Sequence, residues 1–347
     1  MSSADGSGQR RRATMNDVAR HAGVSLGTVS HALNHPSRLS APMLERVRRA
    51  IDELEFRPNG AARSLVVGTS AMIGMILADL GNSYFVDLAR GAETAAQERD
   101  MFLTMANSDV DPAKQRTYLE LFATERVAGV LLAPVPNDLS GVEELRRAGT
   151  PLVLVDAGPE HGECCAARPD NELAGYLAAR HLLELGRSRL AFVGGPLHYT
   201  AIADRLAGAR RAVAEAGTVA RLSFVEVPGL ETGDGRTAGA MLGDLAAADR
   251  PDGIVAASDL LAKGLQQVLL GTQGLRIPGD VALVACEDNR SAFDTIVPIT
   301  TVSLRGLDVG AAAGRLLGEE IAHPEGHAHR TVVVPPRLLV RESTAGR

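Results

Sequence analysis

Residues 14–34 combine small and hydrogen-bonding side chains with the spacing of two short helices joined by a tight turn. Apolar residues that can pack the two helices together recur at helical spacing, namely Val18, Ala22, Val24, Val29 and Leu33. The outer face is then left with Leu26, Gly27, Thr28, Ser30 and His31. Small and polar residues let a helix enter a major groove and contact base edges. A generic helical hairpin shows the same periodicity, so spacing alone leaves both interpretations open.

Two groups of potential metal ligands occur far apart in the sequence: His323, His327 and His329 in one, and His161, Cys164 and Cys165 in the other. Imidazole and thiolate are good zinc ligands, but a metal site needs a fixed element and a complete ligand set. Gly and Pro surround both groups, which predicts loops. We therefore expect solvated loops there, with no metal site.

The common enzyme motifs are missing or broken. Residues 233–238 fit a degenerate dinucleotide fingerprint, but residues 230–232 separate it from the preceding predicted strand. Alanine precedes both lysines of the chain, Lys114 and Lys263, which excludes a Walker A loop ending in Gly-Lys. No GxSxG pattern directly follows a predicted strand, as a nucleophile elbow requires. We expect a protein that is not an enzyme and uses no cofactor.

Charge is distributed unevenly along the 347 residues, of which 45% are hydrophobic and 22% charged. Residues 1–68 contain ten Lys and Arg against six Asp and Glu, whereas the whole chain contains 36 against 42. A basic head on an acidic body fits a head that docks on phosphates. Three cysteines without a CxxC spacing, no secretory signal and no long apolar run indicate a cytoplasmic protein that does not cross a membrane.

Capping signals place three helices in the head after a mobile arm at residues 1–13. Thr14, with Asp17 three residues later, is typical of a capping box, and Gly23 is typical of a left-handed helix end. Ser25 and Ser40 are predicted to cap the second and third helices, at residues 26–33 and 41–53.

From residue 71 onward, short apolar runs alternate with amphipathic stretches. The predicted strands are 72–77, 101–105, 130–132, 152–155, 190–193, 224–227, 254–257 and 281–285. Helical candidates between them include 84–99, 172–185, 205–215 and 260–270. This alternation is typical of parallel sheets with helices on both faces. By strand count, two doubly wound lobes and one barrel fit equally well.

The head and an ordered series of later segments resemble the lactose repressor (LacI/GalR) family. In the head, the resemblance rests on residues 14–34, 39–40, 46–47, 51–59 and 62–65. In the core, it continues at residues 73–74, 82–85, 106–109, 170–171, 205–208 and 298–302. It covers nearly the whole chain after the arm, and the head motif alone is highly specific.

The resemblance implies DNA contacts by a defined set of residues: Thr14, Ser25, Leu26, Gly27, Thr28, Ser30, His31, Asn34, Asn59, Ala62 and Leu65. Leu26, Gly27 and His31 correspond to positions that read base edges. Residues 59–65 correspond to a hinge helix that orders on operator DNA, where Leu65 would wedge into the minor groove. Such an apolar wedge unstacks a base step and bends the DNA.

Three residues of the head and the hinge depart from the family pattern. His31 stands where many relatives have arginine, so a bidentate contact to guanine cannot be assumed. Glu55 replaces the usual glycine before Phe56, which costs on the order of 1 kcal/mol if that position is left-handed. Gly60 weakens the hinge helix by roughly 0.5–1 kcal/mol relative to alanine.

The resemblance also implies a core like that of periplasmic sugar-binding proteins, with a ligand cleft between two lobes. The residues that match the cleft are Tyr84, Phe85, Asp156, Arg205, Ser258, Asp259 and Glu287. Carboxylates, a guanidinium and an aromatic ring suit a carbohydrate. Ser258 and Glu287 replace the more common asparagine and aspartate, which leaves the identity of the ligand open.

These observations predict an all-α helix-turn-helix head followed by an α/β core of two doubly wound parallel sheets. We expect a DNA-binding domain at 14–57, a hinge at 58–68 and a core at 69–347, with one lobe at 69–168 and 302–334 and the other at 169–301 and 335–347. The expected function is a homodimeric repressor of pseudo-palindromic operator DNA, gated by a small-molecule effector, a sugar or sugar derivative. The alternative is a DNA-binding regulator with a vestigial cleft, controlled by a protein partner.

Overall fold

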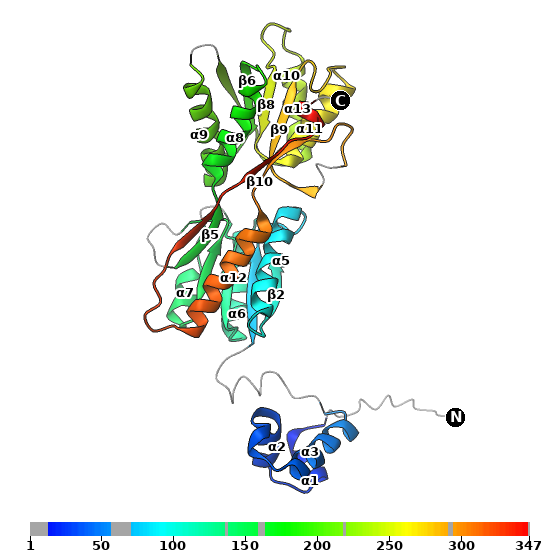
Figure 1. Cartoon of the computed structure of the whole chain (residues 1–347), viewed down its shortest axis with the longest axis vertical. Coiled ribbons are helices and arrows are strands. Elements are labelled where there is room, and N and C mark those ends of the chain that lie inside the picture. Colours follow the sequence, from blue (N-terminus) through cyan, green and yellow to red (C-terminus); the bar gives the residue numbers. More distant parts are fainter. Residues whose placement is uncertain are drawn as a thin grey trace, which may run out of the picture. The chain divides into compact units, whose positions relative to one another are not determined.

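The computed structural model describes residues 13–56, 71–135, 138–158, 164–217, 220–290 and 294–345. The chain divides into two compact units, residues 1–70 and 71–347, which we call the head and the core (Figure 1). The expected arm, the hinge with Gly60, and His161 lie outside the described residues. None of the helices in the described ranges is both long and apolar enough to cross a lipid bilayer.

The described residues of the head, 13–56, form three α-helices and one short 3-10 turn around a small apolar core. The helices are α1 (Met15–Ala22), α2 (Leu26–Asn34) and α3 (Ala41–Glu53), and the 3-10 turn is Pro36–Arg38. Val18, Val29 and Val47, one from each helix, are fully buried against one another. The predicted apolar face of the first two helices is thus confirmed as the face that packs inward.

The local signals at the helix ends are confirmed with one exception. The Thr14 hydroxyl accepts a hydrogen bond from the Asp17 amide while the Asp17 carboxylate accepts from the Thr14 amide, which is a capping box. Gly23 ends α1 at φ 63°, and the Ser25 hydroxyl accepts from the Thr28 amide at 3.1 Å. Ser40 occupies the N-cap position of α3, but its side chain makes no capping hydrogen bond, so that prediction is wrong.

The described residues of the core form two six-stranded sheets. The core therefore has two lobes and is not a single barrel. The sheet of the first lobe has the order β11-β5-β4-β3-β1-β2, and every neighbouring pair is parallel. Its strands are β1 (Met72–Leu77), β2 (Phe102–Asn107), β3 (Gly129–Leu132), β4 (Leu152–Val155), β5 (Cys165–Pro169) and β11 (Thr331–Val334).

The sheet of the second lobe has the order β12-β10-β9-β8-β6-β7, in which only the β10–β12 pair is antiparallel. Its strands are β6 (Arg189–Gly194), β7 (Arg221–Glu226), β8 (Gly253–Ala256), β9 (Ala282–Glu287), β10 (Thr300–Ser303) and β12 (Arg337–Leu339). Most strands are almost wholly buried, as parallel strands covered on both faces should be.

Helices cover both faces of each sheet. In the first lobe they are α5 (Ser83–Gln97), α6 (Pro112–Thr124), α7 (Val142–Arg147) and α12 (Gly306–Ala322). In the second lobe they are α8 (Asn171–Glu184), α9 (Thr200–Glu215), α10 (Thr232–Gly243), α11 (Asp259–Gly271) and α13 (Glu342–Ala345). Helices α5 and α12 pack together, as do α8 with α9 and α10 with α11.

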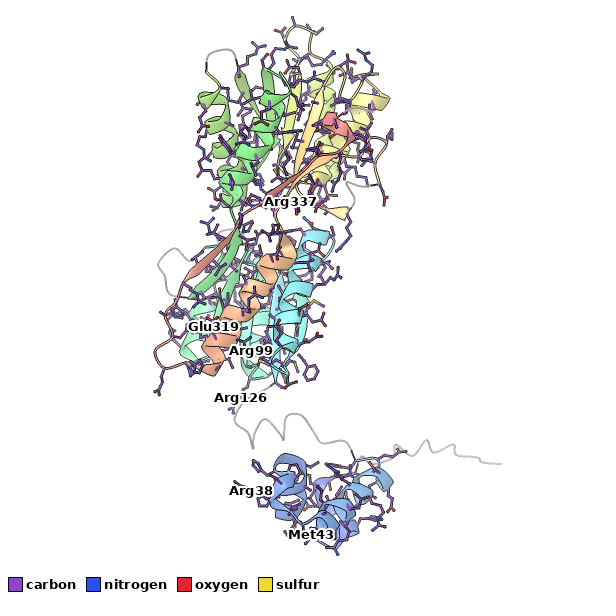
Figure 2. The ribbon with its side chains drawn as sticks, viewed as in Figure 1. Arg38, Met43, Arg99, Arg126, Glu319 and Arg337 are labelled. Carbon is purple, nitrogen blue, oxygen red and sulfur yellow. The ribbon has the colours of Figure 1, made fainter. Side chains whose placement is uncertain are left out.

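The chain crosses between the lobes after β5, after β10 and between β11 and β12. Strand β10 runs to Ser303 in the second sheet, so the lobe boundary falls after residue 303. The sequence placed this boundary between residues 301 and 302. Figure 2 shows Arg99, Arg126 and Glu319 at one end of the first lobe, whereas Arg337 of β12 lies where the chain passes between the lobes.

Glycine permits the close crossing of α8 and α9, and this crossing positions the backbone of Arg205. A Cβ atom on Gly175 of α8 would lie 1.8 Å from the Arg205 carbonyl oxygen, and one on Gly208 of α9 would lie 1.8 Å from the Glu172 carbonyl oxygen. Only hydrogen fits at these two contacts. A Cβ atom on Gly235 of α10 would likewise lie 2.2 Å from the Leu261 carbonyl oxygen of α11, which explains one glycine of the apparent dinucleotide fingerprint.

Candidate functional site

The outer face of α2 presents the residues that the sequence assigned to DNA contact. Leu26, Gly27 and His31 are exposed, and the Leu26 side chain is 47% accessible although it is apolar. Thr28 and Ser30 are partly buried, and the Thr28 hydroxyl lies 2.9 Å from that of Ser25. The three exposed residues lie on one side of the helix, and Gly27 among them has no side chain, so the helix can approach a groove closely at that point.

A polar contact on the surface of the head joins α1 to α3. His21 of α1 and Glu53 of α3 form a surface pair with 2.6 Å between Nε2 and Oε2. Thr14 caps α1, and Asn34 is the last residue of α2. The other three predicted contacts, Asn59, Ala62 and Leu65, lie outside the described residues.

In the core, the first polar pair belongs to the first lobe. Tyr84, near the start of α5, donates a hydrogen bond of 3.0 Å from its hydroxyl to Oδ1 of Asp156, which directly follows β4. Tyr84 is 3% accessible, so this hydroxyl is removed from solvent. Phe85 packs edge-on against Tyr84 with 5.5 Å between ring centroids.

The second polar group surrounds Arg205 in the second lobe. The Arg205 guanidinium donates from Nε to the Asn171 side-chain oxygen at 2.9 Å and from Nη1 to the Ala257 carbonyl at 2.6 Å. Nη1 also lies 3.5 Å from Oε1 of Glu287, and both side chains are at most 8% accessible. The guanidinium is therefore held by three partners. Ala257 follows β8 and Glu287 ends β9 of the second sheet, whereas Asn171 begins α8.

Asparagine side chains join the two groups across the lobes. Asn82, the N-cap of α5, donates from Nδ2 to Oε2 of Glu287 at 3.2 Å. The Asn289 side chain donates from Nδ2 to Oδ1 of Asn82 at 2.9 Å. The backbone amide of Asn289 donates to Oδ2 of Asp259 at 2.8 Å. The carboxyl ends of parallel strands from both sheets thus face each other at one polar site. We refer to this site as the interlobe cluster, which comprises Asn82, Tyr84, Asp156, Arg205, Asp259, Glu287 and Asn289.

Two of the predicted site residues contribute less directly. The Ser258 hydroxyl donates to the Leu230 carbonyl at 2.9 Å and accepts from the Leu261 amide at 3.2 Å, so it serves as the N-cap of α11. Phe85 contacts the cluster through the Tyr84 ring and otherwise packs against the apolar core. The structure brings the other five predicted residues together.

Burial shifts the titration of every acid in the cluster. It raises the pKa of Asp156 to about 6 and that of Asp259 to about 8, in the latter case with help from the Glu287 charge. Burial also raises the pKa of Glu287, despite the attraction of Arg205. Burial alone would lower the pKa of Arg205, but the Glu287 carboxylate and other nearby negative groups outweigh it. Two buried carboxyls, Asp156 and Glu287, therefore share one guanidinium, and Asp259 is mostly protonated at neutral pH.

The backbone is strained where the cluster acids leave their strands. Asp156 has φ 59°, Glu287 has φ 113° and Asp288 has φ 69°, values that side-chain-bearing residues rarely adopt. Each costs of order 1–3 kcal/mol and persists only when the surroundings impose it. Such strain at the ends of β4 and β9 is typical of binding sites.

Sequence reasoning missed the asparagines of the site. Asn82 and Asn289 bridge the lobes, and Asn171 orients Arg205. All three follow a strand directly or within a few residues, at the carboxyl edge where α/β proteins bind ligands. Their position after predicted strands was the signal available, but residue 171 follows β5, which was not predicted.

Comparisons with known proteins agree with both parts of the chain. The family model described as bacterial regulatory proteins, lacI family, matches residues 14–59, and the periplasmic binding protein-like domain matches residues 179–344. The HTH-type transcriptional repressor PurR of Vibrio atlanticus is 32% identical over 336 residues, covering 95% of this chain and 98% of the relative. The ribose operon repressor of Escherichia coli is 32% identical over 339 residues, covering 96% and 100%.

Among solved structures, the complex of the transcriptional regulator CelR with cellobiose is 28% identical, with a TM-score of 0.70 over 96% of this chain and 100% of that one. A helix-turn-helix head followed by a two-lobed core defines the class as DNA-binding transcription regulators that respond to small molecules. The chain belongs to the LacI family of bacterial regulatory proteins. The predicted family, fold class and regulatory function are thereby confirmed, and the matched relatives are regulators rather than enzymes.

Proposed function

We propose that the protein is a homodimeric repressor in the cytoplasm, without enzymatic activity, that binds a pseudo-palindromic operator through its two heads. A neutral carbohydrate held by the interlobe cluster changes its affinity for that operator. The observation that carries the proposal is the direct bonding of the two lobes through buried polar side chains, from Asn82 to Glu287 and from Asn289 to Asn82.

The chemistry of the cluster favours a neutral ligand rich in hydroxyl groups. Its carboxylates accept hydrogen bonds, the Arg205 guanidinium donates them, and each sugar hydroxyl can do both. An anionic ligand such as a sugar phosphate would meet Asp156 and Glu287, and Arg205 already pairs with Glu287. Like charges at buried positions repel strongly, so phosphorylated effectors are disfavoured.

The relatives support the same ligand class. The CelR structure contains cellobiose, and the Escherichia coli relative is named as the repressor of the ribose operon. A ligand that contacts both lobes would exchange the Asn82–Glu287 and Asn289–Asn82 bonds for bonds to itself. It would then stabilise one angle between the lobes, and this differential affinity is what couples the effector to DNA binding.

The edge of the first sheet supports dimerisation through the first lobe. Met72 of β1 and Phe102 of the edge strand β2 are partners in register and are 44% and 72% accessible. Met105 of β2 and Leu121 of α6 add further exposed apolar surface at 54% and 47%. Exposed apolar side chains at an open sheet edge are typical of a protein–protein interface.

Calorimetric titration of the full-length protein tests the effector class. The panel contains neutral mono- and disaccharides, sugar phosphates and free purine bases. We expect a neutral sugar to bind, and we expect Glu287→Gln to weaken it by about 10- to 100-fold, since hydrogen bonds to charged groups contribute about 1.5–3 kcal/mol. Glu226→Gln, at an exposed end of β7, is the matched control and should bind normally.

Two results would contradict the proposed effector site. One is tight binding of a phosphorylated compound or a purine that Glu287→Gln leaves unchanged. The other is an operator affinity that no member of the panel alters, which would favour control by a protein partner.

A further inference from the structure

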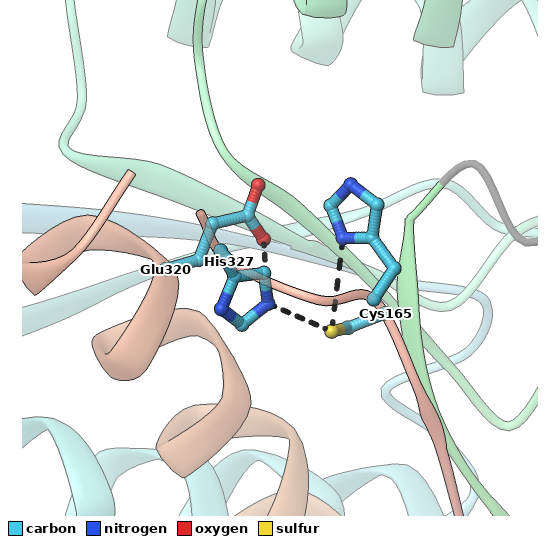
Figure 3. A group of neighbouring side chains, drawn as sticks. Cys165, Glu320 and His327 are labelled. Atoms are coloured by element: carbon cyan, nitrogen blue, oxygen red, sulfur yellow. Dashed lines mark hydrogen bonds and ion pairs between the residues drawn. The ribbon is translucent and has the colours of Figure 1, made fainter. Parts of the chain in front are cut away.

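Four potential metal ligands from three separate segments converge at the outer end of the first lobe. They are Cys165 at the start of β5, Glu320 in the last turn of α12, and His327 and His329 in the segment that leads into β11. The pairing of β11 with β5 produces this convergence, because the Ala166 amide donates to the Arg330 carbonyl at 3.1 Å and Thr331 lies opposite Ala166. Figure 3 shows Cys165, Glu320 and His327 turned toward one another.

This arrangement corrects two expectations from the sequence. Cys165 does not lie in a solvated loop, because it begins a strand and is completely buried. The His327 side chain is only 8% accessible, so it packs inward rather than into solvent. Cys165 from one of these sequence groups and His327 and His329 from the other therefore lie together in space.

The distances within the group fit a four-coordinate ion. The sulfur of Cys165 lies 3.1 Å from Nε2 of His327 and 3.9 Å from Nδ1 of His329, and Nε2 of His327 lies 3.9 Å from Oε2 of Glu320. All four ligand atoms lie within 4.8 Å of one another. In a tetrahedral zinc site, with bonds of about 2.3 Å to sulfur and about 2.0–2.1 Å to nitrogen, neighbouring ligand atoms lie about 3.3–3.6 Å apart.

Two further contacts indicate that a cation belongs there. Oε2 of Glu320 is buried and, within the described part of the chain, has no hydrogen-bond partner. The Arg330 amide points at the Cys165 sulfur from 3.4 Å, as amides do around metal-bound thiolates.

We propose that Cys165, Glu320, His327 and His329 form a binding site for a divalent transition metal ion of the zinc type. One thiolate, two imidazoles and one carboxylate favour zinc over magnesium or calcium, which prefer oxygen ligands alone. Four protein ligands fill a tetrahedron, so the site is structural rather than catalytic. His329 is exposed and gives the ion a path from solvent.

The ion would tie the end of α12 and the segment before β11 to the start of β5. Strand β11 continues directly into the crossover to β12 in the second lobe. Metal binding therefore stabilises the first lobe close to one of the connections between the lobes. This site is separate from the interlobe cluster, and its existence does not depend on the proposed effector.

Zinc and cobalt binding to the untagged full-length protein test the proposal. We expect one tightly bound zinc ion per chain that survives dialysis and raises the thermal unfolding temperature. Cobalt in its place should show the intense ligand-field bands of a four-coordinate ion and a thiolate-to-cobalt charge-transfer band. That charge-transfer band should disappear in Cys165→Ser.

Matched variants separate this site from adventitious binding. His329→Gln alters an exposed ligand and should leave the fold intact while weakening zinc binding by about 100-fold or more, since even partners outside the ligand set contribute 10- to 100-fold. His323→Gln and Cys164→Ser change the same residue types just outside the group and should bind zinc normally. Zinc binding that His329→Gln, His327→Gln and Cys165→Ser all leave unchanged would overturn the proposal, as would a cobalt spectrum without thiolate character or no tight zinc binding at all.

Discussion

Asp259 is a cluster residue whose ionisation depends strongly on burial. Its pKa is raised to about 8 from an ordinary value of 3.8, because it is fully buried and lies near the charge of Glu287. Around neutral pH it is mainly a protonated acid, which donates a hydrogen bond as well as accepting one. A neutral Asp259 also limits the negative charge that a ligand meets between the lobes.

The pH dependence of stability tests this protonation state. Between pH 3.8 and about 8 the folded protein binds the Asp259 proton more tightly than the unfolded chain does, so the free energy of unfolding falls as pH rises through this window. We expect Asp259→Asn to stabilise the protein relative to wild type by at least about 1 kcal/mol more at pH 8 than at pH 5. Denaturant unfolding at both pH values measures the difference.

Asp249→Asn, at an exposed position, serves as the control and should show no such change with pH. An Asp259→Asn variant whose stability relative to wild type is the same at both pH values would show that Asp259 titrates normally.

Among the secondary-structure elements, α3 is followed by a residue, Glu55, whose backbone conformation disfavours a side chain. Glu55 has φ 46°, so the left-handed position expected from the family pattern is confirmed, and a side chain there costs roughly 1–2 kcal/mol. Glu55→Gly should stabilise the head by about 0.5–1 kcal/mol, because greater freedom in the unfolded chain offsets part of the gain. Hydrogen exchange of the head amides in the full-length protein reports this change.

Asp52→Gly is the corresponding control within α3 and should destabilise the head by about 0.5–1 kcal/mol, since glycine weakens a helix. If Glu55→Gly accelerated exchange as much as Asp52→Gly does, the strain at residue 55 would be refuted.

The crossing of α8 and α9 provides a second test at this scale. Gly175→Ala would place a Cβ atom 1.8 Å from the Arg205 carbonyl oxygen, so the helices must separate. We expect a loss of stability of about 1–3 kcal/mol and weaker effector binding, because Arg205 moves with its helix. Gly271→Ala has no atom within 4 Å of the new Cβ and should be neutral or slightly stabilising. Equal effects of the two substitutions on unfolding and on effector affinity would contradict the role of this crossing.

Local signals made most of the head predictable from sequence. The capping box at Thr14, the left-handed Gly23 and the cap at Ser25 depend on neighbours within four residues, and all are confirmed. In the core, buried strands were also predictable, and β1 and β4 have the predicted bounds.

Pairing between distant segments could not be predicted in the same way. Strands β5, β10, β11 and β12 were not predicted. Each of them lies next to a point where the chain crosses between the lobes. Cys165 looked like a loop residue because the strand that buries it pairs with residues 331–334, far away in sequence. Asn82 and Asn289 likewise meet only because the two sheet edges face each other. Residue spacing contains no record of such contacts.

For the whole molecule, binding to a pseudo-palindromic operator requires two chains. Phe102 is 72% accessible on the edge strand β2, where an apolar side chain in water has no stabilising role in a monomer. We expect Phe102→Glu to weaken the dimer by about 10-fold or more, since a charge replaces about 2 kcal/mol of apolar burial. Sedimentation velocity measures the change.

Leu245→Glu changes another exposed apolar residue, in the second lobe, and should leave the dimer intact. Wild-type protein that sediments as a monomer at micromolar concentration would contradict the proposed dimer directly, whatever the variants do.

The measurement that tests the central claim most directly is fluorescence anisotropy of labelled upstream DNA with full-length protein, in the presence of each neutral sugar in turn. We predict tight, palindrome-dependent binding that weakens steeply as salt is raised, because the basic head displaces counterions from phosphates. One neutral sugar should change the operator affinity by about tenfold or more, which corresponds to about 1.4 kcal/mol of coupling. Binding that no sugar alters would contradict gating by the interlobe cluster, and the absence of palindrome-specific binding would contradict the account as a whole.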